Sequence, residues 1–242
     1  NFTAATLNIP FLGLYGACST AALGLGLGAM LLDGGFAGTV LTATSSHNST
    51  AERQYRFPTE YGGQRRPYQQ WTVTGAGAAL LGYDRPGPKI TAVTFGRVVD
   101  LGSTDPLNMG AAMAPAAADT IRQHFKDTGW DPDAFDLIVT GDLGKIGLEL
   151  CRQELADSGL NLGDNFTDCG IIIYDLEKQD VHAGGSGCAA SALVTYGHLY
   201  KQLQRQTIRR LLLVGTGSLH STTSVQQGES IPCIAHAVRI EV

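Results

Sequence analysis

The sequence is poor in charge and in paired cysteines. Only 16% of its 242 residues are charged, and 17 Lys and Arg against 22 Asp and Glu give a net charge of −5. A chain without a basic field lacks what nucleic-acid binding needs, which excludes that class. The cysteines are odd in number, scattered and without C-x-x-C spacing or a histidine cluster, so they predict reduced thiols of a cytosolic-type compartment. They are Cys18, Cys151, Cys169, Cys188 and Cys233.

Charge is entirely absent from residues 1–32, a stretch long enough to cross a bilayer. Against a membrane span stand Pro10 and the glycines at 13, 16, 24, 26 and 28, which divide it into a strand of about seven residues and a helix of about a dozen. A helix buried between sheets is also apolar on every side. No basic segment precedes the run, which argues against a secretory signal. We therefore expect a buried strand–turn–helix and no transmembrane helix.

Glycine is abundant, with 31 of 242 residues, about 13% against a usual 7%. The glycines gather in short turns, which predicts tight turns and close packing. With 43% hydrophobic residues, a chain of this length can bury one large core or two small ones.

The turn Gly16–Thr20 (G-A-C-S-T) lies between the strand-like run 9–15 and the helix-like run 21–32. A side chain at a sharp strand-to-helix turn is lifted clear of the sheet, and the first N–H groups of the helix favour an anion there. The same field favours a thiolate, so Cys18 is a candidate nucleophile. The alternative is an ordinary core cysteine.

Hydrophobic patterns and turn residues predict an alternating α/β chain. The loop 51–70 carries four arginines and three tyrosines, and we interpret it either as a solvated excursion or subunit contact or as a guanidinium clamp for an anion. Strands are expected over 38–44, 71–83, 89–99, 136–140, 169–175, 210–215 and 231–242, and helices over 110–128, 145–158 and 189–204.

The two halves of the chain repeat. The segment from Gly16 to His47 corresponds to that from Gly184 to His220, and 71–83 corresponds to 231–242. Such an internal duplication predicts two similar units, residues 1–109 and 110–242. The second unit has a strand and helix (136–158) before its glycine turn, so we expect the first unit to be truncated at its N-terminal side, with an equivalent portion preceding Asn1.

A duplicated βαβαβ unit with a cysteine at the start of the first buried helix resembles the thiolase and ketoacyl-synthase superfamily. A closer resemblance is carried by the runs G-A-C-S-T, L-D-G-G-F-A, A-T-S-S-H-N-S-T-A-E-R-Q, P-T-E-Y-G-G-Q, M-A-P-A-A-A-D-T-I, T-G-D-L, A-G-G-S-G-C-A and E-S-I-P-C-I-A-H. On these runs the chain is similar to the stage V sporulation protein AD family over essentially all 242 residues. The resemblance implies a thiolase-like α/β fold with duplicated halves in αβαβα layers.

The resemblance also implies a function. It is the non-catalytic binding of pyridine-2,6-dicarboxylic acid (dipicolinic acid) for uptake into the developing spore. The implied setting is peripheral, at the inner forespore membrane, with other stage V sporulation proteins of a channel complex. The superfamily further implies a homodimer. No resident cofactor is expected, although Ca²⁺ is an expected companion of the ligand.

A thiolase-type enzyme would need a histidine in the second glycine loop and an Asn or His at the preceding strand end. Here Gly184 and Gly185 stand in the loop, His182 lies two places early, and the strand end reads T-G-D-L around Asp142. Without the base and the oxyanion donors, several orders of magnitude in rate would be lost. The alternative is an acyl-CoA condensing enzyme using Cys18 with His182, His220 or His236 as base; a third hypothesis is a scaffold whose pocket is vestigial.

Dipicolinate is a flat dianion, so it needs N–H donors, cations and an apolar slot. Asp142 would repel it unless this carboxyl is protonated or calcium, which takes carboxylate oxygens, arrives with the ligand. The strand ends at His47 and His220 and the late C-I-A-H run lie near the expected pocket. The candidate ligand-binding residues are Cys18, Ser19, Thr20, His47, Asp142, Gly184, Gly185, Ser186, His220, Cys233 and His236.

Overall fold

The computed structural model describes residues 2–49 and 66–242. Its largest sheet has five strands in the order β4-β9-β8-β5-β6. Strand β5 runs parallel to β6 and β8, whereas β9 is antiparallel to β8 and β4. These strands are β4 (Lys89–Phe95), β5 (Leu137–Thr140), β6 (Phe166–Asp168), β8 (Arg210–Ser218) and β9 (Cys233–Glu241).

Two smaller sheets complete the strand pairing of the described chain. Strands β1 (Thr39–Ser46) and β3 (Gly75–Gly82) form an antiparallel pair, and the short β2 (Trp71–Thr72) and β7 (Gly185–Ser186) pair in parallel. Strand β4 lies within residues 1–109, yet it hydrogen-bonds to β9 of the second unit.

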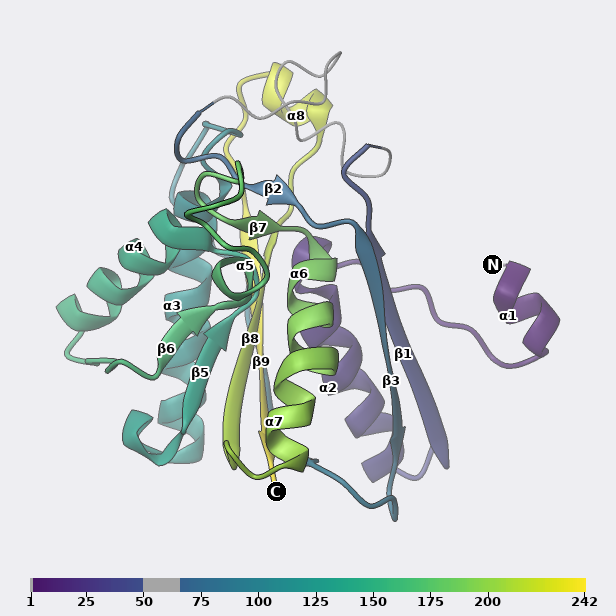
Figure 1. Cartoon of the computed structure of the whole chain (residues 1–242). Helices are drawn as coiled ribbons and strands as arrows, with labels where there is room; N and C mark the ends of the chain where they lie inside the picture. The colour runs from purple at the N-terminus through teal and green to yellow at the C-terminus, as the bar shows by residue number, and fades with distance from the viewer. Residues whose placement is uncertain (1, 50–65) are drawn as a thin grey trace.

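Helices separate and cover the sheets in layers (Figure 1). Helix α2 (Thr20–Asp33) and the continuous rod of α6 (Cys188–Leu193), a π-helical turn (Val194–Leu199) and α7 (Tyr200–Gln204) lie between the β1–β3 pair and the five-stranded sheet. The outer face of the large sheet is covered by α3 (Met109–Thr128) and α4 (Gly144–Asp157). The remaining elements are short: α1 (Phe2–Leu7), η1 (Ala17–Ser19), η3 (Pro132–Ala134), α5 (Cys169–Ile172) and α8 (Thr222–Gln226).

Strand β8 shows why this layering follows from the sequence. Its side chains alternate between two faces: Leu212 and Val214 pack into the core beneath α3, whereas Leu211 and Leu213 pack into the core around α2. All four are fully buried. A strand covered on both faces must be apolar at every position, which is what the run of four aliphatic residues provides.

Helix α2 is confirmed as a helix buried between sheets. Ala21, Ala22 and Leu25 are buried, and its glycines lie against neighbouring strands. At Gly24 and Gly28 a Cβ atom would collide with Thr42 of β1 and Leu81 of β3. The glycines therefore allow the helix to approach the sheet closely.

Three predicted elements are corrected. Residues 9–15 form no strand, because no described strand lies beside them to take their backbone hydrogen bonds. The predicted strand 169–175 begins as helix α5, because Asp168 caps it by accepting the amide of Gly170. The predicted strand 71–83 is split into β2 and β3, which join different sheets.

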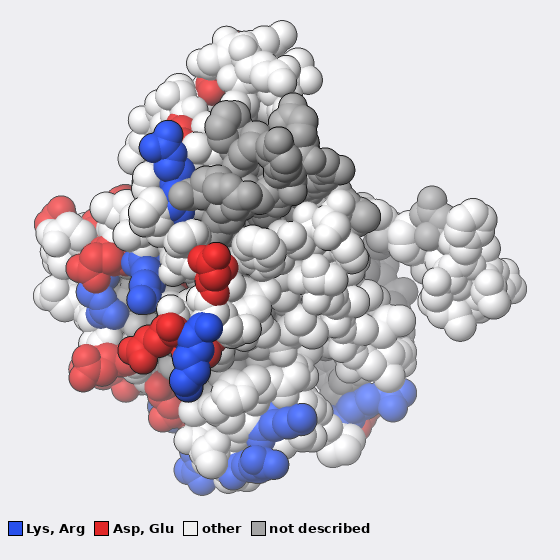
Figure 2. Space-filling view, turned by 45° about the horizontal axis from the view of Figure 1, so that its top comes forward, with Lys and Arg blue, Asp and Glu red and all other residues white. Residues whose placement is uncertain are grey.

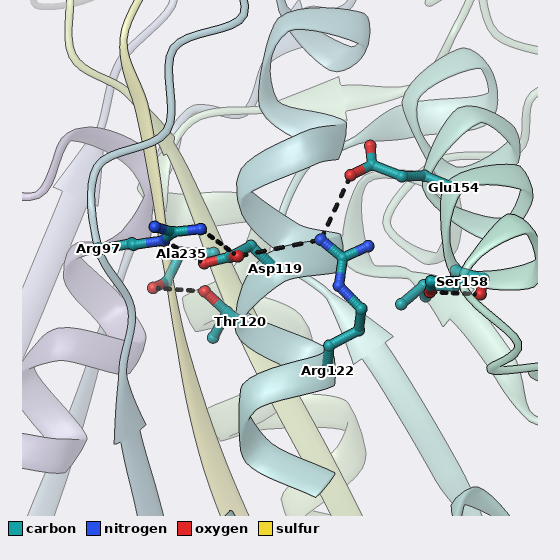
Figure 3. Close-up of polar contacts among 8 residues, drawn as sticks. Arg97, Asp119, Thr120, Arg122, Glu154, Ser158 and Ala235 are labelled. Carbon is teal, nitrogen blue, oxygen red and sulfur yellow. Dashed lines mark hydrogen bonds and ion pairs between the residues drawn. The ribbon is translucent and has the colours of Figure 1, made fainter. Parts of the chain in front are cut away.

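Surface ion pairs hold the outer helices in place (Figure 3). Arg97, in the loop after β4, lies 2.9 Å from Asp119 of α3, and Arg122 of α3 lies 3.5 Å from Glu154 of α4. Thr120 donates to the carbonyl of Ala235 in β9 at 3.2 Å. These contacts join α3 to the sheet and to α4.

None of the helices in the described part of the chain has both the length and the apolar character that a membrane crossing requires. Most of the arginine-rich loop 51–70 lies outside the described residues, so the two interpretations of that loop stay as predictions.

Candidate functional site

The turn that carries Cys18 has the sharp geometry that the sequence predicts. Ala17 has a φ of 49°, a left-handed conformation that is strained for a residue with a Cβ. Side chains lock the turn: Ser19 Oγ donates to the carbonyl of Gly16 at 2.6 Å, and Thr20 Oγ1 donates to that of Ala17 at 2.6 Å. Cys18 is half-buried between them. The turn therefore holds the thiol in a fixed position at the start of α2.

The turn also uses backbone donors that we expected to face a ligand. The amide of Ser19 donates to the carbonyl of Gly16 at 3.0 Å, and the amide of Thr20 donates to that of Ala17. These two N–H groups are satisfied within the 3₁₀ turn η1. These two amides are therefore not available to an anion at this helix start.

Cys18 opens onto a groove of about 1350 Å³ whose lining is mostly apolar. Asp142 and Ser186 reach the groove beside the thiol, and its wall includes Phe11 and Tyr15. Among the described residues that line it, Asp142 alone has a side chain that carries charge near neutral pH. In Figure 2 the charged side chains gather over the part of the molecule that contains α3 and α4, whereas the area between that part and α1 is mostly uncharged.

Asp142 follows β5 and is the electrostatic centre of the site. Its side chain is 1% exposed. It accepts from Thr216 Oγ1 at 2.7 Å and from the amide of Gly187 at 2.9 Å, and it is hydrogen-bonded to the Cys18 thiol. Burial raises the pKa of Asp142 to about 7, against the effect of these three donors.

A second buried carboxyl, Asp168, shapes the loop that carries Asp142. It accepts from Thr140 Oγ1 at 2.7 Å and from the amides of Leu143, Gly144 and Gly170 at 2.8 to 3.0 Å. Burial raises its pKa to about 6, and these four donors oppose that rise. Sequence reasoning missed Asp168, although an aspartate just before a helix start is a recognisable N-cap.

Four of the predicted site residues meet in the groove: Cys18, Thr20, Asp142 and Ser186. Ser19 is fully buried behind the turn. Gly184 and Gly185 are also buried and lie against Gly170, with Gly184 at a φ of 117°. These glycines shape the loop beside the groove and do not line it.

The predicted histidines lie away from the groove lining. His47 is exposed and its Nδ1 accepts the amide of Ser49. His220 is buried against Ser218 at 2.7 Å, and His236 accepts the amide of Gly96. Burial lowers the pKa of both buried histidines, so they are neutral near pH 7.

Cys233 is buried on β9, and burial raises its pKa to about 12, so it stays a thiol. Sequence reasoning missed Ser218 and Cys188, which line the groove, and Thr216, which bonds Asp142. The duplication offered a signal for Cys188, because it stands in the second unit where Cys18 stands in the first.

The layers, the duplicated halves and the cysteine-bearing turn define a thiolase-like fold. Solved structures agree: a tetronic acid condensing enzyme, AbyA1, superposes with a TM-score of 0.60 at 18% identity, covering 100% of this chain and 72% of that one. The 3-oxoacyl-[acyl-carrier-protein] synthase III of Pseudomonas aeruginosa gives 0.60 at 15% identity over 98% of this chain and 70% of the synthase. The corresponding synthase of Aquifex aeolicus gives 0.57 at 12% over 100% and 71%. At these identities the likeness shows the fold alone.

Sequence comparison narrows the class. The family model of stage V sporulation protein AD matches residues 1–241. Stage V sporulation protein AD of Bacillus subtilis (strain 168) is 52% identical over 241 residues, covering 100% of this chain and 71% of that protein. The chain therefore belongs to the stage V sporulation protein AD family.

Proposed function

We propose that the protein binds dipicolinic acid without catalysis and serves its uptake into the developing spore. The family resemblance supplies the ligand, and the groove beside Cys18 offers an apolar slot whose lining includes the polar side chains of Asp142, Ser186 and Ser218, which suits a flat aromatic diacid.

The observation that carries the proposal is the partner of the Cys18 thiol. That partner is the Asp142 carboxyl, and none of the six histidines, all of which are described, lines the groove. A histidine partner stabilises a thiolate as an ion pair, whereas a carboxylate repels it. The arrangement therefore favours a neutral thiol that helps to shape a binding site.

Calorimetric titration tests the proposal. We expect saturable binding of pyridine-2,6-dicarboxylate and at least tenfold weaker binding of the 3,5-isomer, whose carboxylates cannot reach the same end of the groove together. Cys18→Trp, which blocks the part of the groove beside Asp142, should abolish binding, and Cys151→Ser, in a buried position away from the groove, serves as the control. Equal affinity for both isomers would overturn the proposal.

A second experiment addresses acyl transfer. The protein is incubated with acetyl-CoA, and mass spectrometry is used to look for an acyl group on Cys18. We expect no adduct, because the site lacks a base that forms an ion pair with the thiolate. An adduct that is lost in Cys18→Ser would establish the enzymatic alternative.

Calcium accompanying the ligand stays a prediction. The described residues contain no cluster of three or more side chains able to hold a metal ion. A Ca²⁺ ion that arrives with the ligand would therefore take most of its oxygen ligands from dipicolinate and water.

We also propose that the protein acts as a homodimer, peripherally at the inner forespore membrane, with other stage V sporulation proteins as partners. The segment before Cys18 supports dimerisation, since Phe11, Leu12 and Tyr15 are 62%, 70% and 72% exposed. Contiguous exposed apolar side chains of this kind mark interaction sites. Sedimentation should give a dimer that Leu12→Asp converts to a monomer; a monomer in the unsubstituted protein would contradict dimerisation.

A further inference from the structure

An ionised Asp142 would repel any anion that enters the groove. Its carboxyl is buried beside the thiol, and no lysine or arginine lines the groove in the described part of the chain. The charge felt by Asp142 comes from Asp168, which is also a carboxylate. A dianion entering beside an ionised Asp142 would add two units of negative charge to the one already in this low-dielectric site, which is unfavourable.

The hydrogen bonds of Asp142 accommodate a proton without rearrangement. The amide of Gly187 can only donate, so the oxygen it meets, Oδ2, stays an acceptor. The other oxygen, Oδ1, meets the hydroxyl of Thr216. That hydroxyl and the Cys18 thiol can each accept as well as donate. The network therefore fits a neutral carboxyl as well as an ionised one.

The neighbouring titratable groups do not compensate the charge. Burial keeps Cys169 and Cys233 in the thiol form and His220 and His236 neutral. Asp168 has its own four donors, which favour its ionised form over that of Asp142. The titratable groups that face or flank Asp142 are Cys18 from the turn before α2, Cys188 from α6, Asp168 and Cys169 from the end of β6 and α5, and Cys233 from β9.

We propose that Asp142 holds a proton when the groove is occupied, so that binding one dicarboxylate takes up one proton from solvent and the neutral carboxyl donates a hydrogen bond to a ligand carboxylate. The inference rests on the proposed function, because it concerns the same groove and ligand. It makes Asp142 a specificity residue: the neutral acid donates a hydrogen bond to a carboxylate oxygen, whereas it offers a cationic group no compensating charge.

Proton uptake is measured by titrating pyridine-2,6-dicarboxylate calorimetrically at pH 8 in phosphate and in Tris, with EDTA present. The apparent binding enthalpies in the two buffers should differ by the difference between the ionisation enthalpies of the buffers, multiplied by the number of protons taken up, which should be close to one. From pH 7 to pH 8.5 the Kd should rise by about tenfold per pH unit. The uncharged 2,6-dicarboxamide serves as a ligand whose binding should not depend on pH.

Asp142→Asn is the matched variant. Its amide oxygen can accept the N–H of Gly187, and its NH₂ group stands where the protonated oxygen of the acid would be and can donate to a ligand carboxylate. Its Kd for dipicolinate should be the same at pH 7 and pH 8.5, and its binding should take up no proton. Asp175→Asn, at an exposed position, should keep it.

The outcomes separate the two proposals. Absence of dipicolinate binding at every pH would overturn the proposed function. Binding with equal Kd at pH 6.5 and 8.5 and no proton uptake in the unsubstituted protein would overturn the role of Asp142 alone, whether or not the variant folds. Binding that requires Ca²⁺ and fails in EDTA would also overturn it, because the cation would then supply the compensating charge.

Discussion

The two buried helices begin in equivalent turns that have become different sites. Cys188 at the start of α6 is 9% exposed, and its Sγ donates a hydrogen bond to the carbonyl of Ser45 at 3.1 Å. Cys18 before α2 is half-buried, opens onto the groove and meets Asp142. The same motif in a duplicated chain has thus produced a closed turn, in which the cysteine is buried, and an open turn, in which the cysteine is half-buried.

The strand ends opposite these turns explain the difference. At the end of β1, the Ser46 hydroxyl donates to the carbonyl of Val73 at 2.8 Å and accepts the amide of Ala189 at 3.1 Å, which seals the start of α6. At the corresponding part of β8, Gly215 and Gly217 lie against the turn before α2 with no side chain between them. A serine hydroxyl therefore covers the start of α6. At the start of α2 the two glycines have no side chains, and Asp142 is the group that contacts the cysteine.

The largest expected effect comes from breaking the loop that carries Asp142. Asp168→Ala leaves three backbone amides and a threonine hydroxyl without their buried acceptor. We expect a loss of about 4 kcal/mol in the free energy of unfolding. Urea denaturation measures it, with Asp175→Ala, an exposed site, as control. A loss below about 1 kcal/mol would show that these donors are satisfied in another way.

The pH dependence of stability should reveal the two buried acids. Both pKa values are raised in the folded protein, to about 7 for Asp142 and about 6 for Asp168. The folded state therefore binds more protons than the unfolded chain above pH 4. The contribution of these two acids to stability is greatest below pH 4 and falls as the pH rises toward 7, by up to about 1.4 kcal/mol per pH unit for each acid. Asp142→Asn should remove one of these contributions; an unchanged profile would contradict the assignment.

Opening the closed turn is the next test. Ser46→Ala removes the hydroxyl that seals α6, and we expect a loss of about 1.5 kcal/mol in unfolding free energy. Alkylation of Cys188 by iodoacetamide should become severalfold faster. Ser45→Ala, which keeps the carbonyl that Cys188 contacts, is the matched control. Unchanged Cys188 reactivity in Ser46→Ala would mean that another group closes this turn.

The smallest effect concerns the two thiols in the unsubstituted protein. Both thiols line the groove, but Cys18 should be alkylated at least tenfold faster than Cys188, because Cys18 is half-buried whereas Cys188 is buried and donates to the carbonyl of Ser45. Asp142→Asn should accelerate Cys18 further at pH 8 by a few fold, since removing the carboxylate favours the thiolate. Peptide mass spectrometry follows both sites in one reaction. Equal rates would remove the contrast between the two turns.

The sequence determined the elements with strong periodicity and local turn chemistry. The duplication, the buried helices and the apolar strand β8 were predictable because each depends on composition over many consecutive residues. The sharp turn at Cys18 and the position of Asp142 at a strand end were predictable for the same local reasons.

Tertiary structure alone decided what these residues meet. Residues 9–15 have the composition of a strand, but a strand exists only where another chain segment takes its backbone hydrogen bonds. Asp142 is joined to Thr216, 74 positions away, and to the thiol of Cys18 in the other half of the chain. Burial by these distant segments raises its pKa, since no local pattern states which carboxyl will lose its water.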